Sequence, residues 1–494
     1  MLNKGLSPDK HETVFHGSSG DDGGSFGTKR APQVKAFPAV SKLGQQLLDA
    51  GLINTAQLEY VLQFQKTKGG RLGDILVSLG MISQSDFEKI IIPERRKLPL
   101  GEMLLQEGVI EEVQLKQALS FQEKSGGLLG DILITLGMAK PEAVYRELAT
   151  QNQIGRVGMM FDFQEAQKLP YAIAKKYQVC VINHEKSRYL VAALHKLLGP
   201  ETAEIESFLD MKIEVVLAEQ HEMENFWKIA YDSDLVDESI NRLRNEMAEN
   251  SAQETFTRSQ KIILIGLGAL MGLGLVFNFT VTLILINVII QGLYFLISTH
   301  KMYILTRGIN ADSQIKISEQ EVQALDEREL PIYTILVPIY KEAGVIKDLL
   351  DHLDKLDYPK TKLDVRLLLE EVDLDTIQAV QSYQLPYYCT ALTVPSSQPQ
   401  TKPKACNYGL IRARGKYVVI YDAEDRPELD QLKKAYLAFK QLSDQYICVQ
   451  AKLNYYNCDD NLLTKWFTQE YSMWFELLLP GISKMKIPVP LGGT

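Results

Sequence analysis

The sequence has few cysteines and no surplus of positive charge, and both absences restrict the class of protein. Only five of its 494 residues are cysteines, and none forms a Cys-x-x-Cys pair. This argues against a disulfide framework or a zinc ribbon and favours a reducing compartment. The net charge is −9, which argues against binding of a long nucleic acid, because that ligand needs a basic surface. The 46% hydrophobic and 23% charged residues are typical of a globular chain of about two to four domains.

Charged residues are missing altogether from residues 262–299, a run of 38. One membrane span needs about 20 residues, so the run predicts two short spans, about 261–277 and 281–300, with a turn near Asn278. Basic residues flank both ends, which favours the cytoplasmic side for both. A membrane hairpin is favoured over a buried soluble hairpin, since soluble cores rarely contain so long an uncharged run.

A unit marked by a Leu-Gly pair recurs four times within the first 151 residues, at intervals of 28 or 29 residues. Each unit has a leucine three residues after its first glycine and a second glycine seven residues after it. An apolar residue follows at the fourteenth position, and glutamine or glutamate at the twenty-first. The first glycines are Gly44, Gly73, Gly101 and Gly130, and the leucines are Leu47, Leu76, Leu104 and Leu133.

This spacing predicts a helix–turn–helix in each unit. The leucine and the later apolar residue have helical spacing and face one core, and the second glycine ends the first short helix. The first Leu-Gly pair is harder to explain by packing alone, and a glycine just before a helix lets a phosphate approach exposed backbone N–H groups. The Lys or Arg in some units can pair with phosphate or stack on a purine, and the glutamine amide suits a base edge.

The doubled unit resembles the N-terminal domain of type II secretion and pilus-extension ATPases of the MshE type, in which it binds cyclic di-GMP. Residues 42–94 and 99–151 then form two modules. The first has Glu94 where glutamine is expected, and the second has Pro99 and Leu128 where arginine is expected. Binding is favoured for the first module, while binding and a ligand-free helical scaffold stay open for the second. The resemblance implies binding by Lys42, Leu43, Gly44, Leu47, Gln65, Arg71, Leu72, Gly73, Leu76, Gly101, Gln122, Gly130 and Gln151.

Three segments around these modules carry no recognisable chemistry. Residues 1–40 are rich in Gly, Ser and Asp without an apolar stretch, so a disordered tail is expected rather than a signal peptide. Residues 152–235 alternate strand-like and helix-like runs, with strands expected at 179–182, 189–193 and 212–217. They resemble the small α/β subdomain of secretion ATPases. Residues 236–260 are polar, and a helical linker is expected there.

Beyond the apolar run, β-rich segments at 333–338, 364–369 and 416–421 alternate with helical ones. This predicts a mostly parallel α/β sheet, whose ligands lie beyond the carboxyl ends of the strands. Asp422 and Glu424 follow one strand and suit a hard cation such as Mg²⁺ or Mn²⁺, which would bridge a diphosphate. Lys404 is expected to neutralise phosphate or leaving-group charge.

The order of these segments over 330–494 resembles the GT-A fold of processive family 2 glycosyltransferases. The resemblance implies transfer of a hexose from a nucleotide sugar by in-line displacement, with the metal held by Asp422 and Glu424. The family's general base is expected beyond Thr494, so the chain is expected to be truncated and inactive alone. The residues implied to bind the nucleotide sugar are Pro338, Tyr340, Glu342, Glu371, Asp373, Lys404 and Asn407.

Together these segments predict a multidomain α + α/β membrane protein with helical-repeat modules, a transmembrane hairpin and an incomplete GT-A-like domain. The arrangement resembles cyclic-di-GMP-regulated glycosyltransferases of the NfrB phage-adsorption type. It implies a bacterial inner-membrane enzyme with cytoplasmic modules that uses a nucleotide sugar, a polysaccharide acceptor, membrane lipid and envelope export partners. A secretion ATPase would need a G-x-x-x-x-G-K-[ST] loop, which the sequence lacks. A catalytically inactive cyclic-di-GMP receptor or scaffold remains the alternative.

Overall fold

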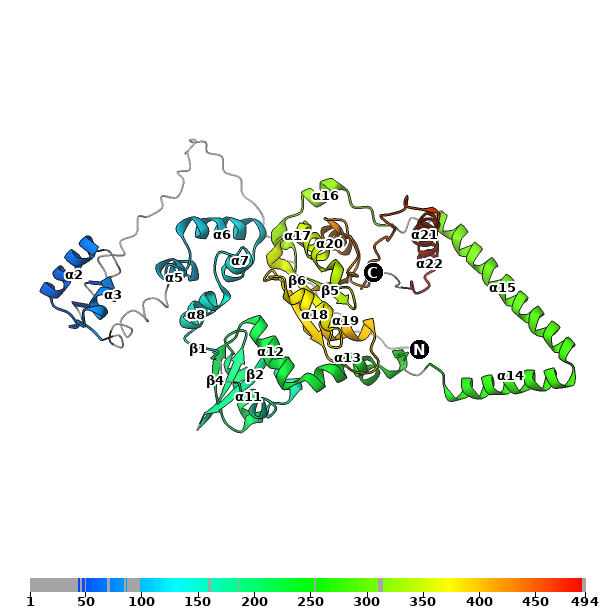
Figure 1. The fold of residues 1–494 in the computed structure, drawn as a ribbon, viewed down its shortest axis with the longest axis horizontal. Helices are drawn as coiled ribbons and strands as arrows, with labels where there is room; N and C mark the ends of the chain where they lie inside the picture. Colours follow the sequence, from blue (N-terminus) through cyan, green and yellow to red (C-terminus); the bar gives the residue numbers. More distant parts are fainter. Residues whose placement is uncertain are drawn as a thin grey trace, which may run out of the picture. The chain divides into compact units, whose positions relative to one another are not determined.

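The computed structural model of the protein describes two compact units, which divide after Ile91 (Figure 1). Each unit is considered by itself. The described residues are 43–44, 47–48, 50–68, 72–83, 86, 98–158, 161–185, 187–252, 255–309 and 314–490.

The first unit contains the described part of the first helical module, residues 42–94. Its helices include α2 (Thr55–Lys68) and α3 (Leu72–Ser78). Leu47 and Leu76, which the repeat places in the core, are fully buried. Gly51 and Gly80 end the short helices with φ of +69° and +68°, a conformation that glycine adopts without strain. The predicted core and helix ends are therefore confirmed here.

The second unit begins with the second helical module, residues 99–151. Each of its repeats pairs a seven-residue helix with a longer one, as predicted. Leu104 and Leu133 are fully buried, and Gly108 and Gly137 have φ of +67°. The four helices are α5 (Leu100–Gln106), α6 (Glu112–Ser125), α7 (Leu129–Thr135) and α8 (Pro141–Asn152).

The first glycine of the repeat has a packing role that the sequence analysis did not expect. Gly101 lies inside α5, and a Cβ atom built on it would lie 2.6 Å from Cδ1 of Leu115. A Cβ atom built on Gly130 would lie 3.0 Å from Cγ1 of Val144, and one built on Gly44 would lie 2.9 Å from Cδ1 of Leu58. In each case the neighbour is the apolar residue fourteen positions later. The expectation that packing alone does not explain this glycine is therefore wrong.

The small subdomain, residues 155–246, contains a four-stranded sheet of order β1-β4-β3-β2. Strands β2 and β3 are antiparallel, and the other pairs are parallel. The three strands expected from the sequence are present. Residues 236–246, expected to be part of a helical linker, are helical, and their helix packs on α19 of the next domain. The elements are β1 (Gly155–Arg156), α9 (Phe163–Ala166), α10 (Tyr171–Tyr177), β2 (Val179–Glu185), β3 (Arg188–Ala193), α11 (Gly199–Leu209), β4 (Lys212–Leu217), α12 (Gln220–Ala230) and α13 (Asp232–Glu246).

The uncharged run forms a helical hairpin of α14 (Arg258–Phe277) and α15 (Phe279–Ile309). Asn278 separates the two helices, as predicted, and its Oδ1 accepts a hydrogen bond from the Val281 amide. Both helices have the length and composition of membrane spans. Helix α15 runs past the expected end at residue 300. A Cβ atom on Gly308 would clash with the Leu477 carbonyl, so glycine permits close packing of this extension on the C-terminal helices.

The C-terminal domain is built on a parallel sheet of order β7-β6-β5-β8, which confirms the predicted α/β sheet. Side chains alternate between its two faces: Val337 and Leu367 pack toward one helical layer, whereas Leu336 and Leu368 pack toward α19 and the small subdomain. The sequence analysis did not expect β7. The main elements are η2 (Glu327–Glu329), β5 (Tyr333–Ile339), α17 (Ile346–Lys355), η4 (Lys360–Lys362), β6 (Leu363–Glu370), α18 (Leu374–Gln381), β7 (Cys389–Val394), α19 (Lys402–Leu410), β8 (Tyr417–Ile420), α20 (Gln431–Gln441), α21 (Leu462–Met473), η5 (Trp474–Leu478) and α22 (Leu479–Lys484).

Candidate active site

Acidic side chains follow the carboxyl ends of three neighbouring strands of this sheet. Glu342 comes after β5, Glu371 and Asp373 come after β6, and Asp422 and Glu424 come after β8. The strands are parallel and in register, with Ile339 opposite Leu369 and Leu336 opposite Ile420. The fold therefore places these predicted residues at one edge of the sheet, where α/β folds bind their ligands.

Asp373 connects two of the loops at this edge. Its carboxylate accepts hydrogen bonds from the backbone amides of Lys341 and, at 3.3 Å, of Thr376, where it caps α18. Burial opposes ionisation of Asp373, but these hydrogen bonds outweigh it and lower its pKa. Lys341 has a φ of +60°, which a non-glycine residue rarely adopts. The Asp373 carboxylate thus holds the turn after β5 in a fixed conformation.

Glu342, Asp422 and Glu424 form a group of like charges. Burial raises the pKa of Glu342, and the charges of Glu424 and Asp422 raise it further. No three His, Cys, Asp or Glu side chains in the described ranges are close enough to hold a metal ion by themselves. Two carboxylates completed by diphosphate oxygens would still form an oxygen ligand set that suits Mg²⁺ or Mn²⁺. A divalent cation would also relieve the repulsion, so the residues present fit the predicted metal.

Two lysines of α19 have different surroundings. The Lys404 side chain is buried, with its Nζ 3.3 Å from Glu370 Oε2 and 3.0 Å from the Pro395 carbonyl. Lys402 is half-exposed and forms an ion pair with Asp422. The sequence analysis gave the phosphate-neutralising role to Lys404, whereas Lys402 is the lysine that lies at the predicted metal site. Glu370 and Lys402 were not among the predicted site residues, although Glu370 precedes Glu371 directly and Lys402 lies two residues before Lys404.

The remaining predicted donor residues are distributed around this edge. Pro338 lies within β5 opposite Leu368, and Tyr340 is half-exposed, with Lys341 Nζ 5.1 Å from its ring centroid. Glu371 accepts a hydrogen bond from the Ser396 amide at 2.9 Å. The Asn407 side-chain amide donates to the Ser239 carbonyl of α13 at 2.9 Å.

In the helical modules, the predicted cyclic-di-GMP residues differ in their surroundings. The Gln122 amide donates to the Gly127 carbonyl at 2.8 Å, and the Gln151 amide donates to the Leu98 carbonyl at 3.0 Å. Both therefore hold the chain around the second module's repeats in this structure. Lys42 and Arg71 lie outside the described residues. Those that contribute to the helical cores are Leu43, Gly44, Leu47, Leu72, Gly73, Leu76, Gly101 and Gly130.

The second module contacts the C-terminal domain through the turn between its two repeats. Ser125 Oγ donates to Glu327 Oε2 of η2 at 2.8 Å. Lys362 of η4 donates to two carbonyls of the same η2 segment, and it lies close to Gly126. In the first module, Arg71 corresponds to Leu128, which lies two residues after Gly126. The second module thus packs against protein next to Leu128, the position where the resemblance places a ligand contact, while Leu128 itself is exposed.

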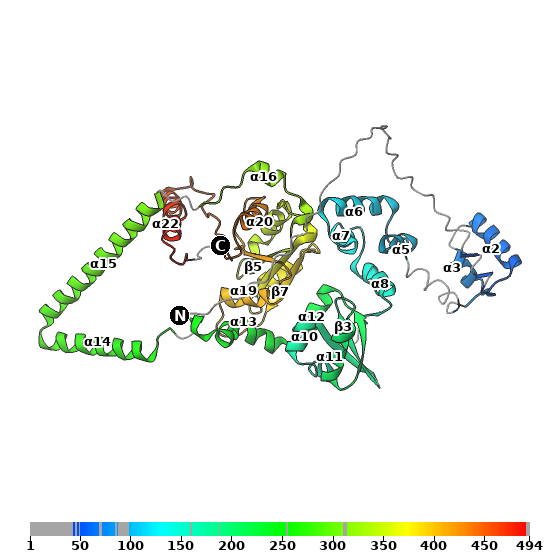
Figure 2. The same cartoon turned by 180° about the vertical axis from the view of Figure 1, so that it is seen from behind.

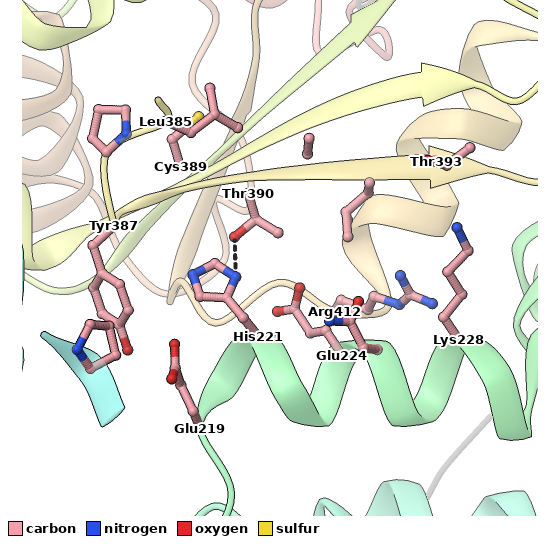
Figure 3. A pocket seen from close by; sticks show the side chains of 15 residues that line it. Glu219, His221, Glu224, Lys228, Leu385, Tyr387, Cys389, Thr390, Thr393 and Arg412 are labelled. Carbon is pink, nitrogen blue, oxygen red and sulfur yellow. Dashed lines mark hydrogen bonds between the residues drawn. The ribbon is translucent and has the colours of Figure 1, made fainter. Parts of the chain in front are cut away.

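Helix α12 of the small subdomain faces β7, and a hollow of about 480 Å³ lies between them (Figure 3). His221 on α12 lies 3.4 Å from Thr390 Oγ1 of β7. On the neighbouring strand β6, the fully buried Arg366 forms an ion pair with Glu224 of α12, at 3.1 Å. Sequence reasoning missed this contact, although Asp364 and Arg366 stand out as charges within an apolar strand.

Comparison with known proteins gives a family for the C-terminal part. Residues 334–491 match the family described as Glycosyl transferase family 2. The "Probable glycosyltransferase YdaM" of Bacillus subtilis is 27% identical over 146 residues, which cover 29% of this chain and 34% of that protein.

Other similarities involve the secretion and pilus ATPases. The "Type IV pilus assembly ATPase PilB" of Thermus thermophilus is 51% identical over 57 residues, or 12% of this chain and 6% of that protein. The solved structure of MshE with "cdg" is 26% identical, with a TM-score of 0.24, and the alignment covers 27% of this chain and all of that one. The chain spans about a third or less of the two curated relatives. Residues 334–491, which carry the acidic edge described above, are a glycosyl transferase family 2 domain.

Proposed function

We propose that this chain is a membrane glycosyltransferase that transfers a hexose from a nucleotide sugar to a growing exopolysaccharide, under the control of cyclic di-GMP. The observation that carries the proposal is the group of acidic side chains at the carboxyl ends of β5, β6 and β8, inside the segment that matches family 2. Glu371 and Asp373 would contact the nucleoside, and Lys404 would stay close to them through its contact with the Pro395 carbonyl.

The chemistry follows from the charges at this edge. A Mg²⁺ or Mn²⁺ ion held by Asp422 and Glu424 would stabilise the departing diphosphate while the acceptor attacks the anomeric carbon. Lys402 would be displaced from Asp422 when the cation binds, and its ammonium group would then be available to a phosphate oxygen. The fixed turn at Lys341 would place Tyr340 and Glu342 beside the donor.

The hairpin of α14 and α15 supports a location at the bacterial inner membrane. Both helices expose apolar side chains along their length, and basic residues flank the pair. The end of α15 packs on η5 and α22 through Ile304 and Gly308. This would keep the transferase at the cytoplasmic surface, where a growing polymer could pass to export partners.

Cyclic di-GMP would act through the first helical module, which keeps Lys42 and Arg71. Regulation requires that the ligand bind two states of the protein with different affinity. The docking of the second module on η2 and η4 offers one contact that such a ligand could favour or oppose.

Donor binding tests the transferase half of this proposal. The full chain in lipid nanodiscs would be titrated calorimetrically with UDP-glucose, UDP-N-acetylglucosamine and GDP-mannose, each with MnCl₂. We expect one donor to bind, and Asp422→Asn to weaken that binding at least about tenfold, the effect of losing about 1.4 kcal/mol. The exposed Asp444→Asn variant is the matched control. If the folded chain binds none of these donors with the metal present, the transferase assignment fails.

A further inference from the structure

Helix α19 carries Lys402, Lys404 and Asn407, and it is covered on its outer side by α13 of the small subdomain (Figures 1 and 2). The two domains share one apolar core at this place. Ala405 and Tyr408 of α19 pack in the same cluster as side chains of the small subdomain such as Leu235. A helix that supplies predicted donor contacts is therefore held between the transferase sheet and a second domain.

A buried ion pair fixes the position of the small subdomain on the sheet. Arg366 of β6 is fully buried, with Nη1 3.1 Å from Glu224 of α12 and Nη2 3.0 Å from Asp364. Asp364 also lies 3.3 Å from Arg414 Nε, so two carboxylates balance two guanidinium groups. Removing one partner from such a group leaves an uncompensated buried charge, which is strongly unfavourable. The pair therefore specifies where α12 docks.

A hydrogen bond fixes the second contact, at α19, the helix that carries Lys404 and Asn407. The Asn407 amide of α19 donates to the Ser239 carbonyl of α13 at 2.9 Å, and Ser239 is buried. Because the acceptor is a backbone atom, its place depends on the docking of α13 as a whole. The orientation of α19 thus depends on the same interface that the ion pair specifies.

The interface also opens onto the predicted nucleoside contacts. A hollow of about 590 Å³ is lined by Asn225, Lys228 and Asp232 of the small subdomain and by Glu371 and Pro395 at the strand ends. The side chains of Lys228, Glu224 and Arg412 line the neighbouring hollow, which is the one between α12 and β7 (Figure 3). Arg412 is nine-tenths buried, and its Nε has no hydrogen-bond partner among the described residues.

We infer that the small subdomain is a structural part of the nucleotide-sugar site, and that Glu224, acting through Arg366, is a positioning residue for that site. Lys228 adds a positive charge beside Glu371 at the nucleoside end. This inference rests on the proposed transferase function. It assigns to residues 155–246 a role in donor affinity, rather than that of a spacer between the regulatory modules and the enzyme.

The test compares donor affinity in full-length variants in nanodiscs, with the same three donors and MnCl₂ as probes. We expect Glu224→Gln to raise the dissociation constant about tenfold and to speed amide hydrogen exchange in α19, but not in α20. The matched control is Glu222→Gln, which lies on the same helix and breaks an ion pair with Arg156 inside the small subdomain. The double variant Glu224→Gln, Arg366→Gln removes the uncompensated charge, so we expect it to recover part of the affinity.

The Lys228→Ala variant provides a second test of the inference, because it leaves the buried ion pair between Arg366 and Glu224 intact. Its side chain is partly exposed, so the variant is expected to fold and to bind donor about threefold more weakly. The control is Lys212→Ala, which lies on β4. Unchanged donor affinity in folded Glu224→Gln and in Lys228→Ala would overturn the inference alone. Failure of the wild-type chain to bind any donor would overturn the proposed function and this inference together.

Discussion

The ammonium group of Lys402 forms an ion pair with the carboxylate of Asp422, the residue predicted to hold the metal. A divalent cation bound at Asp422 would therefore compete with Lys402 for the same oxygens. We predict that Lys402→Met strengthens binding of Mn²⁺ alone by about threefold or more, because an exposed ion pair contributes up to about 1 kcal/mol. Electron paramagnetic resonance of free Mn²⁺ would measure this. Asp422→Asn should abolish the site, and an unchanged Mn²⁺ affinity in Lys402→Met would contradict the competition.

The interface between α12 and β7 should respond to pH through Glu219. Burial, and next the charge of Glu222, raise the pKa of Glu219 to about 7. A carboxyl group with a raised pKa is protonated in the folded protein at pH values where the unfolded chain has lost its proton. The contribution of Glu219 to the free energy of unfolding is therefore fully present below its pKa in the unfolded chain, near 4.5. It is lost as the pH rises through about 7.

The corresponding measurement is thermal unfolding of the full chain at several pH values from about 5 to 8. We expect the melting temperature of the second unit, which contains Glu219, to fall as the pH rises across this range. In the Glu219→Gln variant, the melting temperature should depend less on pH. The raised pKa of Glu219 corresponds to a change of at most about 3 kcal/mol in the free energy of unfolding. Glu249→Gln serves as a control, because Glu249 is an exposed carboxylate outside α12. An equal pH dependence in Glu219→Gln and wild type would show that other groups are responsible.

The motif glycines should be more sensitive to alanine than glycines in open positions. The Cβ atom of Gly101→Ala would overlap Leu115, and overpacking of this kind costs about 1–3 kcal/mol. At Gly158 and Gly199 nothing lies within 4 Å of an added Cβ, so alanine there is the matched control. Chemical denaturation would distinguish them. Equal stability of Gly101→Ala and Gly199→Ala would show that the repeat tolerates the extra methyl group.

The sequence predicted local structure well because its signals are local. The leucines at 47 and 104 have helical spacing, and both are fully buried. The acidic residues after β6 and β8 could be placed at one edge because parallel strands share a direction. The packing role of Gly101 was missed, since its partner Leu115 becomes a neighbour only after two helices fold together.

The contacts between domains could not be predicted in the same way. Arg366 lies in an apolar strand, and nothing near it in the sequence identifies Glu224, which lies before the hairpin of α14 and α15, as its partner. The choice between Lys402 and Lys404 also depended on tertiary structure. The two lysines share one helix, but one side chain is buried against Glu370 and the other reaches Asp422.

The two helical modules should differ in ligand binding, and stoichiometry tests this. In the second module, Pro99 and Leu128 replace the basic residues, and the turn at Ser125 and Gly126 packs against η2 and η4. The first module keeps Lys42 and Arg71. We therefore predict that the full chain binds about one cyclic di-GMP per chain in calorimetric titration, with the site in the first module.

Substitutions in each module locate that site. Arg71→Ala should weaken cyclic di-GMP binding at least about tenfold, since it removes a charged phosphate or purine contact. Gln151→Ala should leave binding unchanged, because Gln151 holds the Leu98 carbonyl within the second module. Lys116→Ala on α6 controls for loss of surface charge. Two equivalent sites per chain, or loss of binding in Gln151→Ala with Arg71→Ala unaffected, would place the ligand in the second module, and its docking on the transferase would then have to open for binding.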